Sequence, residues 1–213
     1  MNLDRLEEQG VIFLDKSRVY IDDIVEIGEG TLIYPDVTIL GNSIIGKNNT
    51  IGSFTELSHV QLGDGNEIKM SSISNSRLQD NNFIGPFCSI RDDSVVGSNC
   101  TIGNFVEIKA SVLKNDVFVK HLSYIGNTTL EDRVDVGAGT VVANFDGKEK
   151  YSTNIGADVF IGSNSTLIAP LSVGENAMIG AGSVITEDVP PSKLAIARSY
   201  QSIHERKDID GNC

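Results

Sequence analysis

The chain has 213 residues, of which 40% are hydrophobic but only 6% are aromatic, and it contains no tryptophan. A core built from aliphatic side chains favours thin, regular layers. The formal net charge of −12 argues against nucleic acid as a partner, because phosphate backbones attract basic surfaces. An anionic small ligand would have to be bound by a local group of cations.

The start of the chain is expected to form a short helix or linker remnant over residues 1–18. The stretch "NLDRLEEQ" can form a helix that covers the first coil of the repeats described below. Its acidic residues and short apolar stretch exclude a signal peptide and a membrane span. The three cysteines have no metal-binding spacing and therefore predict a reducing, cytoplasmic location. We interpret Cys88 and Cys100, two repeat lengths apart, as core residues; the third is Cys213.

A six-residue repeat dominates the sequence from about residue 19 onward. Aliphatic residues recur six apart and are often followed by glycine, as in Ile27, Ile33, Ile39, Ile45 and Ile51. This period suits a short strand followed by a corner, where glycine and asparagine most readily adopt positive φ. Three such strands close a triangular coil. We therefore predict an all-β fold, a parallel β-helix over residues 19–189 with roughly nine coils, about 45 Å long at ~4.8 Å per coil.

Two segments depart from this repeat. The polar stretch "ANFDGKEKYSTN" contains an Asp-Gly turn signal, and we expect residues 143–154 to project from one corner as a loop. Loops of this kind on rigid scaffolds commonly carry function. From Pro190 and Pro191 onward, residues 190–213 are expected to leave the coil as a tail. Caps of this sort cover the open sheet edges at the ends of a coil.

Two cations occur where glycine is usual. Arg91 and Lys109 directly follow the inward residues Ile90 and Ile108 and are separated by one full coil. We expect them to stack on one corner in adjacent layers, where a planar guanidinium and a point charge suit a phosphate. The alternative is that both are solvated surface cations near some of the many carboxylates.

His121 interrupts the repeat in "VKHLSYIG". It lies about two-thirds of a coil beyond Lys109, which places it near the next corner. Because an unperturbed imidazole titrates near neutrality, it is a candidate general base; the alternative is a hydrogen-bonded surface histidine. The other histidines, His59 and His204, lie several coils away and in the tail. A three-histidine metal site is therefore not readily assembled, and we predict no metal.

Several motifs between Gly85 and Arg198 occur in a characteristic order: "GPF…R", "GNFVEIK", "HLSYIG", "VGAGTVVANFDG" and "LIAPLSVGENAMIGAGSVI". This series resembles the C-terminal acetyltransferase domain of the bifunctional UDP-N-acetylglucosamine pyrophosphorylase/glucosamine-1-phosphate N-acetyltransferases, which are hexapeptide-repeat acyltransferases. The resemblance implies a left-handed β-helix and a homotrimer with active sites between subunits. It also implies acetyl-CoA as co-substrate, glucosamine 1-phosphate as acceptor, and no metal for acetyl transfer. The family's N-terminal uridylyltransferase half has no counterpart here, so we expect the N-acetyl sugar phosphate rather than the UDP-sugar.

The resemblance also implies roles for individual residues. His121 matches the catalytic base, Tyr124 a substrate contact, and Arg91, Lys109 and Lys150 the ligands of the sugar phosphate. The residues that match acetyl-CoA contacts are Ala138, Asn144, Phe145, Ser163, Ala181 and Arg198.

Two positions depart from the family pattern. Phe145 stands where tyrosine is common, and Asp135 stands where an asparagine usually contacts the sugar. A carboxylate at Asp135 accepts hydrogen bonds but donates none, and beside His121 it would favour the imidazolium. It could instead hold the ammonium of the substrate, or indicate a different amino sugar.

Three alternatives remain open from the sequence. The first is an acyltransferase with another acceptor, such as a galactosamine phosphate or a nucleotide-linked amino sugar, which Asp135 favours. The second is a non-catalytic trimeric scaffold, which is disfavoured by the joint presence of five residues, His121, Arg91, Lys109, Lys150 and Arg198. The third is a metal-dependent hydratase on the same fold, which the low histidine count disfavours.

Overall fold

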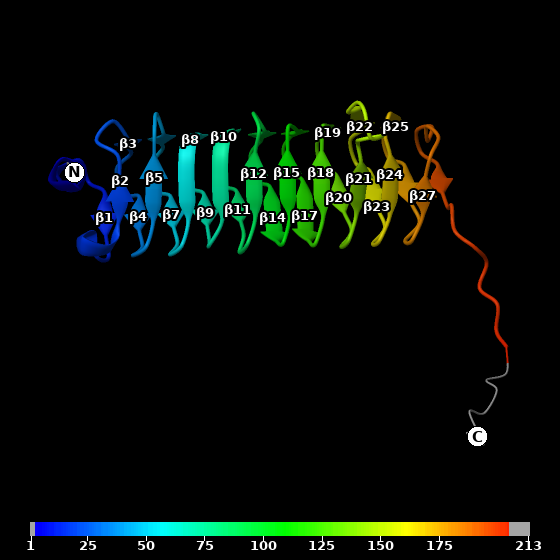
Figure 1. The fold of residues 1–213 in the computed structure, drawn as a ribbon, viewed down its shortest axis with the longest axis horizontal. Coiled ribbons are helices and arrows are strands. Elements are labelled where there is room, and N and C mark those ends of the chain that lie inside the picture. Colours follow the sequence, from blue (N-terminus) through cyan, green and yellow to red (C-terminus); the bar gives the residue numbers. More distant parts are fainter. Residues whose placement is uncertain (1–2, 205–213) are drawn as a thin grey trace, which may run out of the picture.

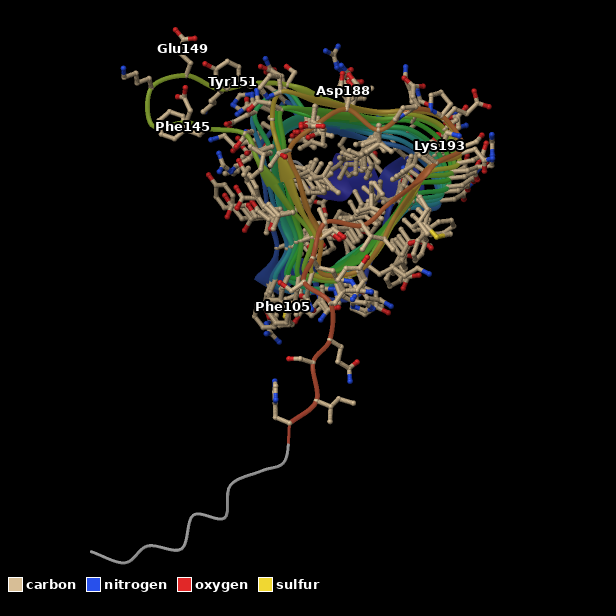
Figure 2. All side chains as sticks on the ribbon, turned by 90° about the vertical axis from the view of Figure 1, so that its right-hand side faces the viewer. Phe105, Phe145, Glu149, Tyr151, Asp188 and Lys193 are labelled. Atoms are coloured by element: carbon tan, nitrogen blue, oxygen red, sulfur yellow. The ribbon has the colours of Figure 1, made fainter. Side chains whose placement is uncertain are left out.

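The computed structural model describes residues 3–204. Short parallel strands follow one another around a three-sided coil whose layers stack into a prism (Figure 1). The view along the prism shows its triangular cross-section (Figure 2). The prediction of a parallel β-helix is therefore confirmed, and its left hand stays a prediction from the resemblance.

Each side of the triangle is a ladder of strands from successive coils. Among residues 3–204 the first face has eleven: β1 (Ile12–Phe13), β4 (Leu32–Ile33), β7 (Thr50–Ile51), β9 (Glu67–Ile68), β11 (Phe83–Ile84), β14 (Thr101–Asn104), β17 (Phe118–His121), β20 (Asp135–Val136), β23 (Phe160–Ile161), β26 (Met178–Ile179) and β28 (Leu194–Ala195). The second face contains β2 (Tyr20–Ile21), β5 (Thr38–Leu40), β8 (Glu56–Leu62), β10 (Ser72–Leu78), β12 (Ser89–Arg91), β15 (Glu107–Lys109), β18 (Tyr124–Gly126), β21 (Val141–Ala143), β24 (Thr166–Ile168) and β27 (Val184–Ile185).

The third face contains β3 (Glu26–Ile27), β6 (Ile44–Ile45), β13 (Val95–Val96), β16 (Val112–Leu113), β19 (Thr128–Leu130), β22 (Thr153–Ile155) and β25 (Leu171–Val173). The long strands β8 and β10 continue from the second face into the third, where they pair with β6 and β13. The three ladders together enclose the core.

The predicted inward residues form the core. Ile33, Ile51, Ile68 and Ile84 are register partners on successive strands of the first face and are fully buried. Burying one such side chain contributes about 1.5–3 kcal/mol, so ladders of aliphatic residues account for most of the stabilisation.

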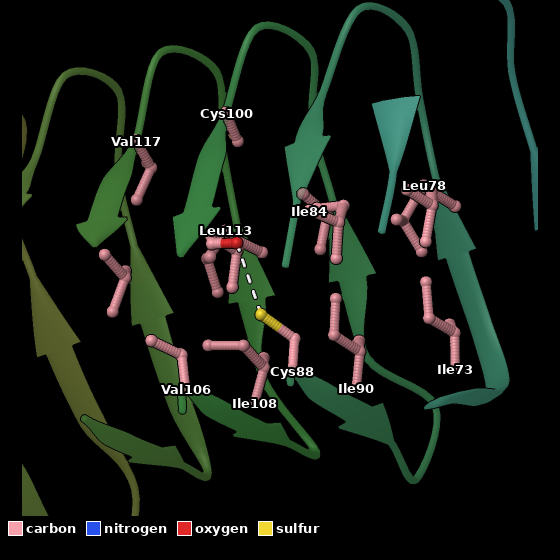
Figure 3. Close-up of a cluster of buried hydrophobic side chains, with 14 of the residues drawn as sticks. Ile73, Leu78, Ile84, Cys88, Ile90, Cys100, Val106, Ile108, Leu113 and Val117 are labelled. Atoms are coloured by element: carbon pink, nitrogen blue, oxygen red, sulfur yellow. Dashed lines mark hydrogen bonds between the residues drawn. The ribbon is translucent and has the colours of Figure 1, made fainter. Parts of the chain in front are cut away.

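Two cysteines belong to the same core. Cys88 and Cys100 are buried, and Figure 3 shows them among isoleucine, leucine and valine side chains. Burial raises the pKa of each thiol to about 11. Their interpretation as core residues is confirmed, whereas Cys213 lies outside the described residues.

The three corners differ in sequence. The corner between the third and first faces follows expectation, with asparagine, aspartate or glycine at many positive-φ positions, such as Asn81 and Asn99. The corner between the first and second faces, which we call the aromatic corner, instead places Phe54, Phe87 and Phe105 at φ of 57 to 61°. For a residue with a side chain this conformation is unfavourable by about 1–2 kcal/mol. The corner between the second and third faces carries the projecting loop, and we call it the loop corner.

The ends of the coil extend the predicted range on both sides. Helix α1 (Leu3–Glu8) covers the first coil, with Leu3 and Leu6 buried, and a short 3₁₀ helix, η1 (Lys16–Arg18), follows β1. Nine first-face strands among the described residues lie within 19–189, and β1 and β28 lie beyond it. After β28 the chain leaves the prism (Figure 1). Within residues 3–204 no helix is long and apolar enough to span a membrane.

Candidate functional site

The two predicted cations meet at the loop corner. Arg91 ends β12, Lys109 ends β15, and the two are register partners on adjacent coils, so the expected stacking is confirmed. Lys109 is opposite Gly126 on β18 in the next coil. Both positive charges therefore lie at the same edge of the prism, where strands of the second face end.

Both cations are paired with carboxylates. The Glu107 carboxylate accepts hydrogen bonds from Nε and Nη2 of Arg91, the former at 3.1 Å. Oδ2 of Asp92 lies 3.0 Å from Nη1 of Arg91 and 3.6 Å from Nζ of Lys109. These contacts, Glu107 foremost, hold the pKa of Arg91 above its ordinary value. Sequence reasoning anticipated carboxylates near these cations only as the alternative to a phosphate site.

Two further predicted residues reach this corner across Gly126. A methyl group on Gly126 would lie 2.5 Å from the hydroxyl oxygen of Tyr124 and 2.7 Å from Nδ2 of Asn144. These two polar side chains occupy the space above Gly126, so a larger residue at this position would have to displace them. Nδ2 of Asn144 also donates to Oδ1 of Asn127 at 2.7 Å. Tyr124 and Asn144 thus lie on the same edge as the cation pair.

The projecting loop begins next to this group. Figure 2 shows it extending outward from the triangle, with Phe145, Glu149 and Tyr151 along it. Asp146 fixes its tip by accepting hydrogen bonds from the backbone N–H groups of Lys148 and Glu149, both at 2.8 Å. These bonds, that of Glu149 first, lower the pKa of Asp146. Lys150 and Phe145 face each other in an isolated antiparallel bridge and are both exposed.

His121 lies at a different corner. It ends β17 on the first face and is exposed, directly before Leu122 at the aromatic corner. The expected distance of about two-thirds of a coil beyond Lys109 is confirmed, but this is the second corner after Lys109 and not the next one. Its ring nitrogen Nδ1 is 2.7 Å from Oδ1 of Asn104, its register partner in the preceding coil. An amide oxygen only accepts, so in this contact Nδ1 carries hydrogen and donates, and Nε2 is the nitrogen that is left available to accept a proton. Sequence reasoning missed Asn104, although its place one coil before His121 was a usable signal.

The aromatic corner changes character at His121. In the preceding coils it is a ridge of exposed apolar side chains, where the rings of Phe87 and Phe105 stack with centroids 5.2 Å apart. After Leu122 the corner residues become Gly139, Asn164 and Gly182. His121 therefore lies where large exposed side chains on this corner give way to small ones. We call the part of the corner beyond Leu122, with Gly139, Asn164 and Gly182, the shelf.

Predicted cofactor residues form that shelf. The carbonyl groups of His121, Ala138 and Ser163 accept hydrogen bonds from corner residues of the following coil at 3.2, 2.7 and 2.8 Å, which places the three in one column. Ala181 continues the column, because a methyl group on Gly162 would lie 2.4 Å from its backbone nitrogen. Arg198 approaches the same edge at Gly182. Such small residues leave room for a ligand against the backbone.

Asp135 does not lie beside His121 within one chain. Asp135 is the register partner of Phe118 and Phe160 on the first face, three residues before the position opposite His121. The expectation that it neighbours His121 is therefore not met. Among residues 3–204 no group of three or more histidine, cysteine or acidic side chains is arranged to hold a metal ion.

The chain resembles known proteins both in its repeats and in its fold. The family model "Bacterial transferase hexapeptide (six repeats)" matches residues 24–59, 75–110 and 152–187, about half of the chain. Among solved structures, UDP-N-acetylglucosamine acyltransferase (LpxA) from Bacteroides fragilis has a TM-score of 0.56 at 20% identity, covering 85% of this chain and 70% of that one. The Arabidopsis UDP-N-acetylglucosamine acyltransferase has a TM-score of 0.52 at 18% identity, covering 88% and 70%. At these identities the likeness shows the fold.

Similarity in sequence is higher to curated relatives. "Bifunctional protein GlmU" of Synechococcus elongatus is 44% identical over 206 residues, which is 95% of this chain and 46% of the relative. The protein of the same name from Thermotoga maritima is 44% identical over 203 residues, again 95% and 46%. The chain thus spans about half the length of the curated relatives it matches. With its repeats, its parallel coil and these relatives, the chain belongs to the bacterial transferase hexapeptide family.

Proposed function

We propose that the chain is an acetyl-CoA-dependent sugar N-acetyltransferase, with glucosamine 1-phosphate as the acceptor. The observation that carries this proposal is the contact between His121 and Asn104 at the step onto the shelf. It orients an exposed basic nitrogen beside a strip of small residues, as amine acetylation requires. The resemblance to the acetyltransferase domain supports the identity of both substrates.

The shelf would bind acetyl-CoA. Ala138, Ser163 and Ala181 offer a column of small side chains and backbone groups, and Arg198 supplies a positive charge for the phosphates of the nucleotide. Asn144 and Phe145, at the base of the loop, would contact the same co-substrate. The acetyl thioester would then lie near His121.

His121 would act as the general base. An amino sugar is largely an ammonium near neutrality and cannot attack until it loses a proton. The ammonium first loses one proton to solvent. Nε2 then takes a second proton from the neutral amine as its nitrogen bonds to the acetyl carbon and the carbon–sulfur bond breaks, which gives the amide and CoA thiolate. His121 then returns the proton to solvent or to the thiolate. General-base catalysis of this kind typically contributes about 10²–10⁴-fold.

The acceptor phosphate would bind at the loop corner, to Arg91 and Lys109 with Lys150 from the loop. In one chain this group is separated from His121 by the width of the second face. Gly126 comes five positions after His121, a span of at most about 18 Å. A homotrimer would resolve this separation by bringing the loop corner of one subunit against the aromatic corner of the next. A cytoplasmic location is proposed from the cysteine usage.

The test of the activity is release of CoA thiol from acetyl-CoA with a panel of amino sugars and their phosphates. His121→Ala should lower kcat by about 10²–10⁴-fold, with His59→Ala, an exposed histidine of the loop corner, as the matched control. Release that is independent of His121 would refute its role. No release with any acceptor would refute the activity and favour a scaffold.

The trimer has a separate test. Sedimentation should give the mass of three chains. His121→Ala should lose kcat, and Arg91→Ala should chiefly raise the KM for the sugar phosphate. Mixing the two kinds of subunit should restore activity at a low concentration of sugar phosphate, because some interfaces then combine an intact histidine with an intact arginine. If co-refolded mixtures stay inactive, the site is not shared between subunits.

A further inference from the structure

One carboxylate oxygen contacts both cations of the loop corner. Oδ2 of Asp92 is 3.0 Å from Nη1 of Arg91 and 3.6 Å from Nζ of Lys109. These are the nitrogens that the proposed function assigns to the phosphate of the acceptor. A phosphate oxygen that bound between these two nitrogens would compete with this carboxylate oxygen for the same position.

We infer that Asp92 is a built-in competitor for the acceptor phosphate, which must be displaced before a phosphate monoester binds between Arg91 and Lys109. The identity of that ester rests on the proposed function. The competition between the carboxylate and an anion depends only on the contacts at this corner.

The two carboxylates that contact Arg91, those of Glu107 and Asp92, have different roles. Glu107 accepts from two nitrogens of Arg91, Nε and Nη2, and so fixes the plane and direction of the guanidinium. Asp92 contacts the remaining nitrogen, Nη1, through one oxygen. Its side chain is 47% exposed, so the carboxylate regains water when it turns away. Its departure leaves Arg91 held by Glu107, with Nη1 directed at the vacated position.

The charges of the cluster determine which anions can displace Asp92. With Asp92 in place, two cations face two carboxylates and the cluster is neutral. A phosphate monoester near neutrality carries close to two negative charges and several acceptor oxygens, which a carboxylate does not. Only an anion of that strength gains enough from Arg91 and Lys109 to displace Asp92. The competitor therefore weakens the binding of every anion that displaces it by the same factor, and a phosphate ester, which gains most from the two cations, still binds where carboxylates and chloride do not.

The neighbouring residue provides a matched control. Asp92 and Asp93 both have φ of 59°, and asparagine tolerates this conformation at least as well as aspartate. The Asp93 carboxylate makes no ion pair in the part of the chain that the structure describes. Asp92→Asn and Asp93→Asn therefore remove the same charge from adjacent positions, and only the first removes the bridge.

Steady-state kinetics with the amino-sugar phosphate give the first readout. Asp92→Asn should lower the KM for the sugar phosphate roughly 3- to 10-fold, the scale of an exposed ion pair plus relief of charge repulsion. It should leave kcat and the KM for acetyl-CoA unchanged, and Asp93→Asn should match wild type. Equal KM values in all three proteins, or equal decreases in both variants, would overturn the inference.

Calorimetric titration with inorganic phosphate gives a readout that needs no turnover. Asp92→Asn should bind phosphate more tightly than both wild type and Asp93→Asn, whereas affinity for acetate should stay weakest in all three. If acetyl transfer is absent but this order holds, the proposed function fails and the inference stands. If transfer is present and phosphate affinities are equal, the inference fails alone. If Asp92→Asn unfolds at a lower temperature than wild type, Asp92→Gly, which also suits positive φ, takes its place. The same order of KM values and of phosphate affinities is expected for it.

Discussion

The hydrogen bond between Asn104 and His121 makes the sharpest test of how this site works. In Asn104→Ala the imidazole loses its partner at 2.7 Å, so it is free to change tautomer and to rotate. A neutral hydrogen bond is worth about 0.5–1.5 kcal/mol net, which corresponds to roughly a 2- to 13-fold decrease in kcat. This is far smaller than the loss expected for His121→Ala, because the base itself remains.

Three measurements separate a positioning role from a structural one. Thiol release across pH should show the lower kcat in Asn104→Ala while the KM for acetyl-CoA stays constant. Asn104→Asp should shift the acidic limb of the pH profile of kcat/KM upward, because a carboxylate at Nδ1 favours the imidazolium. The double variant Asn104→Ala, His121→Ala should be no slower than His121→Ala alone. An unchanged kcat in Asn104→Ala, or an effect of Asn104→Ala in the absence of His121, would refute this reasoning.

Three further predictions concern the core, the coil and the acceptor. Thermodynamically, the Cys88 thiol, with its pKa raised to about 11, contributes stability that is fully present below about pH 8.5 and is lost as pH rises toward 11. Between pH 8 and pH 10.5 the free energy of unfolding, measured by denaturant titration, should therefore fall by about 2 kcal/mol less in Cys88→Ala than in wild type. Equal decreases in both proteins would contradict this. Gly103→Ala would place a methyl 1.9 Å from the carbonyl oxygen of Lys120, so thermal unfolding should show a loss of about 3 kcal/mol or more; Gly52→Ala, with 3.1 Å available, is the control that should lose much less. Asp135→Asn should alter the relative kcat/KM among hexosamine 1-phosphates, and identical ratios in both proteins would dismiss a role in selectivity.

The sequence predicted the parts of the fold that depend on spacing. The positions of the inward aliphatics, the stacking of Arg91 on Lys109 and the loop after Ala143 all follow from a period that the structure repeats with little change. Bulky residues at positive φ were not foreseen, because their stacking on one corner depends on side-chain contacts between coils that local preference does not contain.

The site was predicted less completely. The sequence indicated His121 but not its partner Asn104, and it indicated the cation pair but not the Asp92 bridge, because both depend on side-chain rotamers across adjacent coils. The expected contact between Asp135 and His121 was wrong within the chain for a simpler reason. Register pairs Asp135 with Phe118, three residues before His121, so the period itself was enough to separate them.

The projecting loop leaves the ladders on both sides of it undisturbed. Before the loop, Val142 is paired with Leu167, and after it Ile155 is paired with Leu130, as in coils without an insertion. The loop closes at its base, where the Tyr151 backbone N–H donates to the Asn144 carbonyl at 2.8 Å. Because doubling the length of a closed loop costs only about 0.6 kcal/mol, its length and sequence can vary without loss of the fold. The segment at the loop corner is thus exchangeable, and its sequence can change while His121 and the column of Ala138, Ser163 and Ala181 stay fixed.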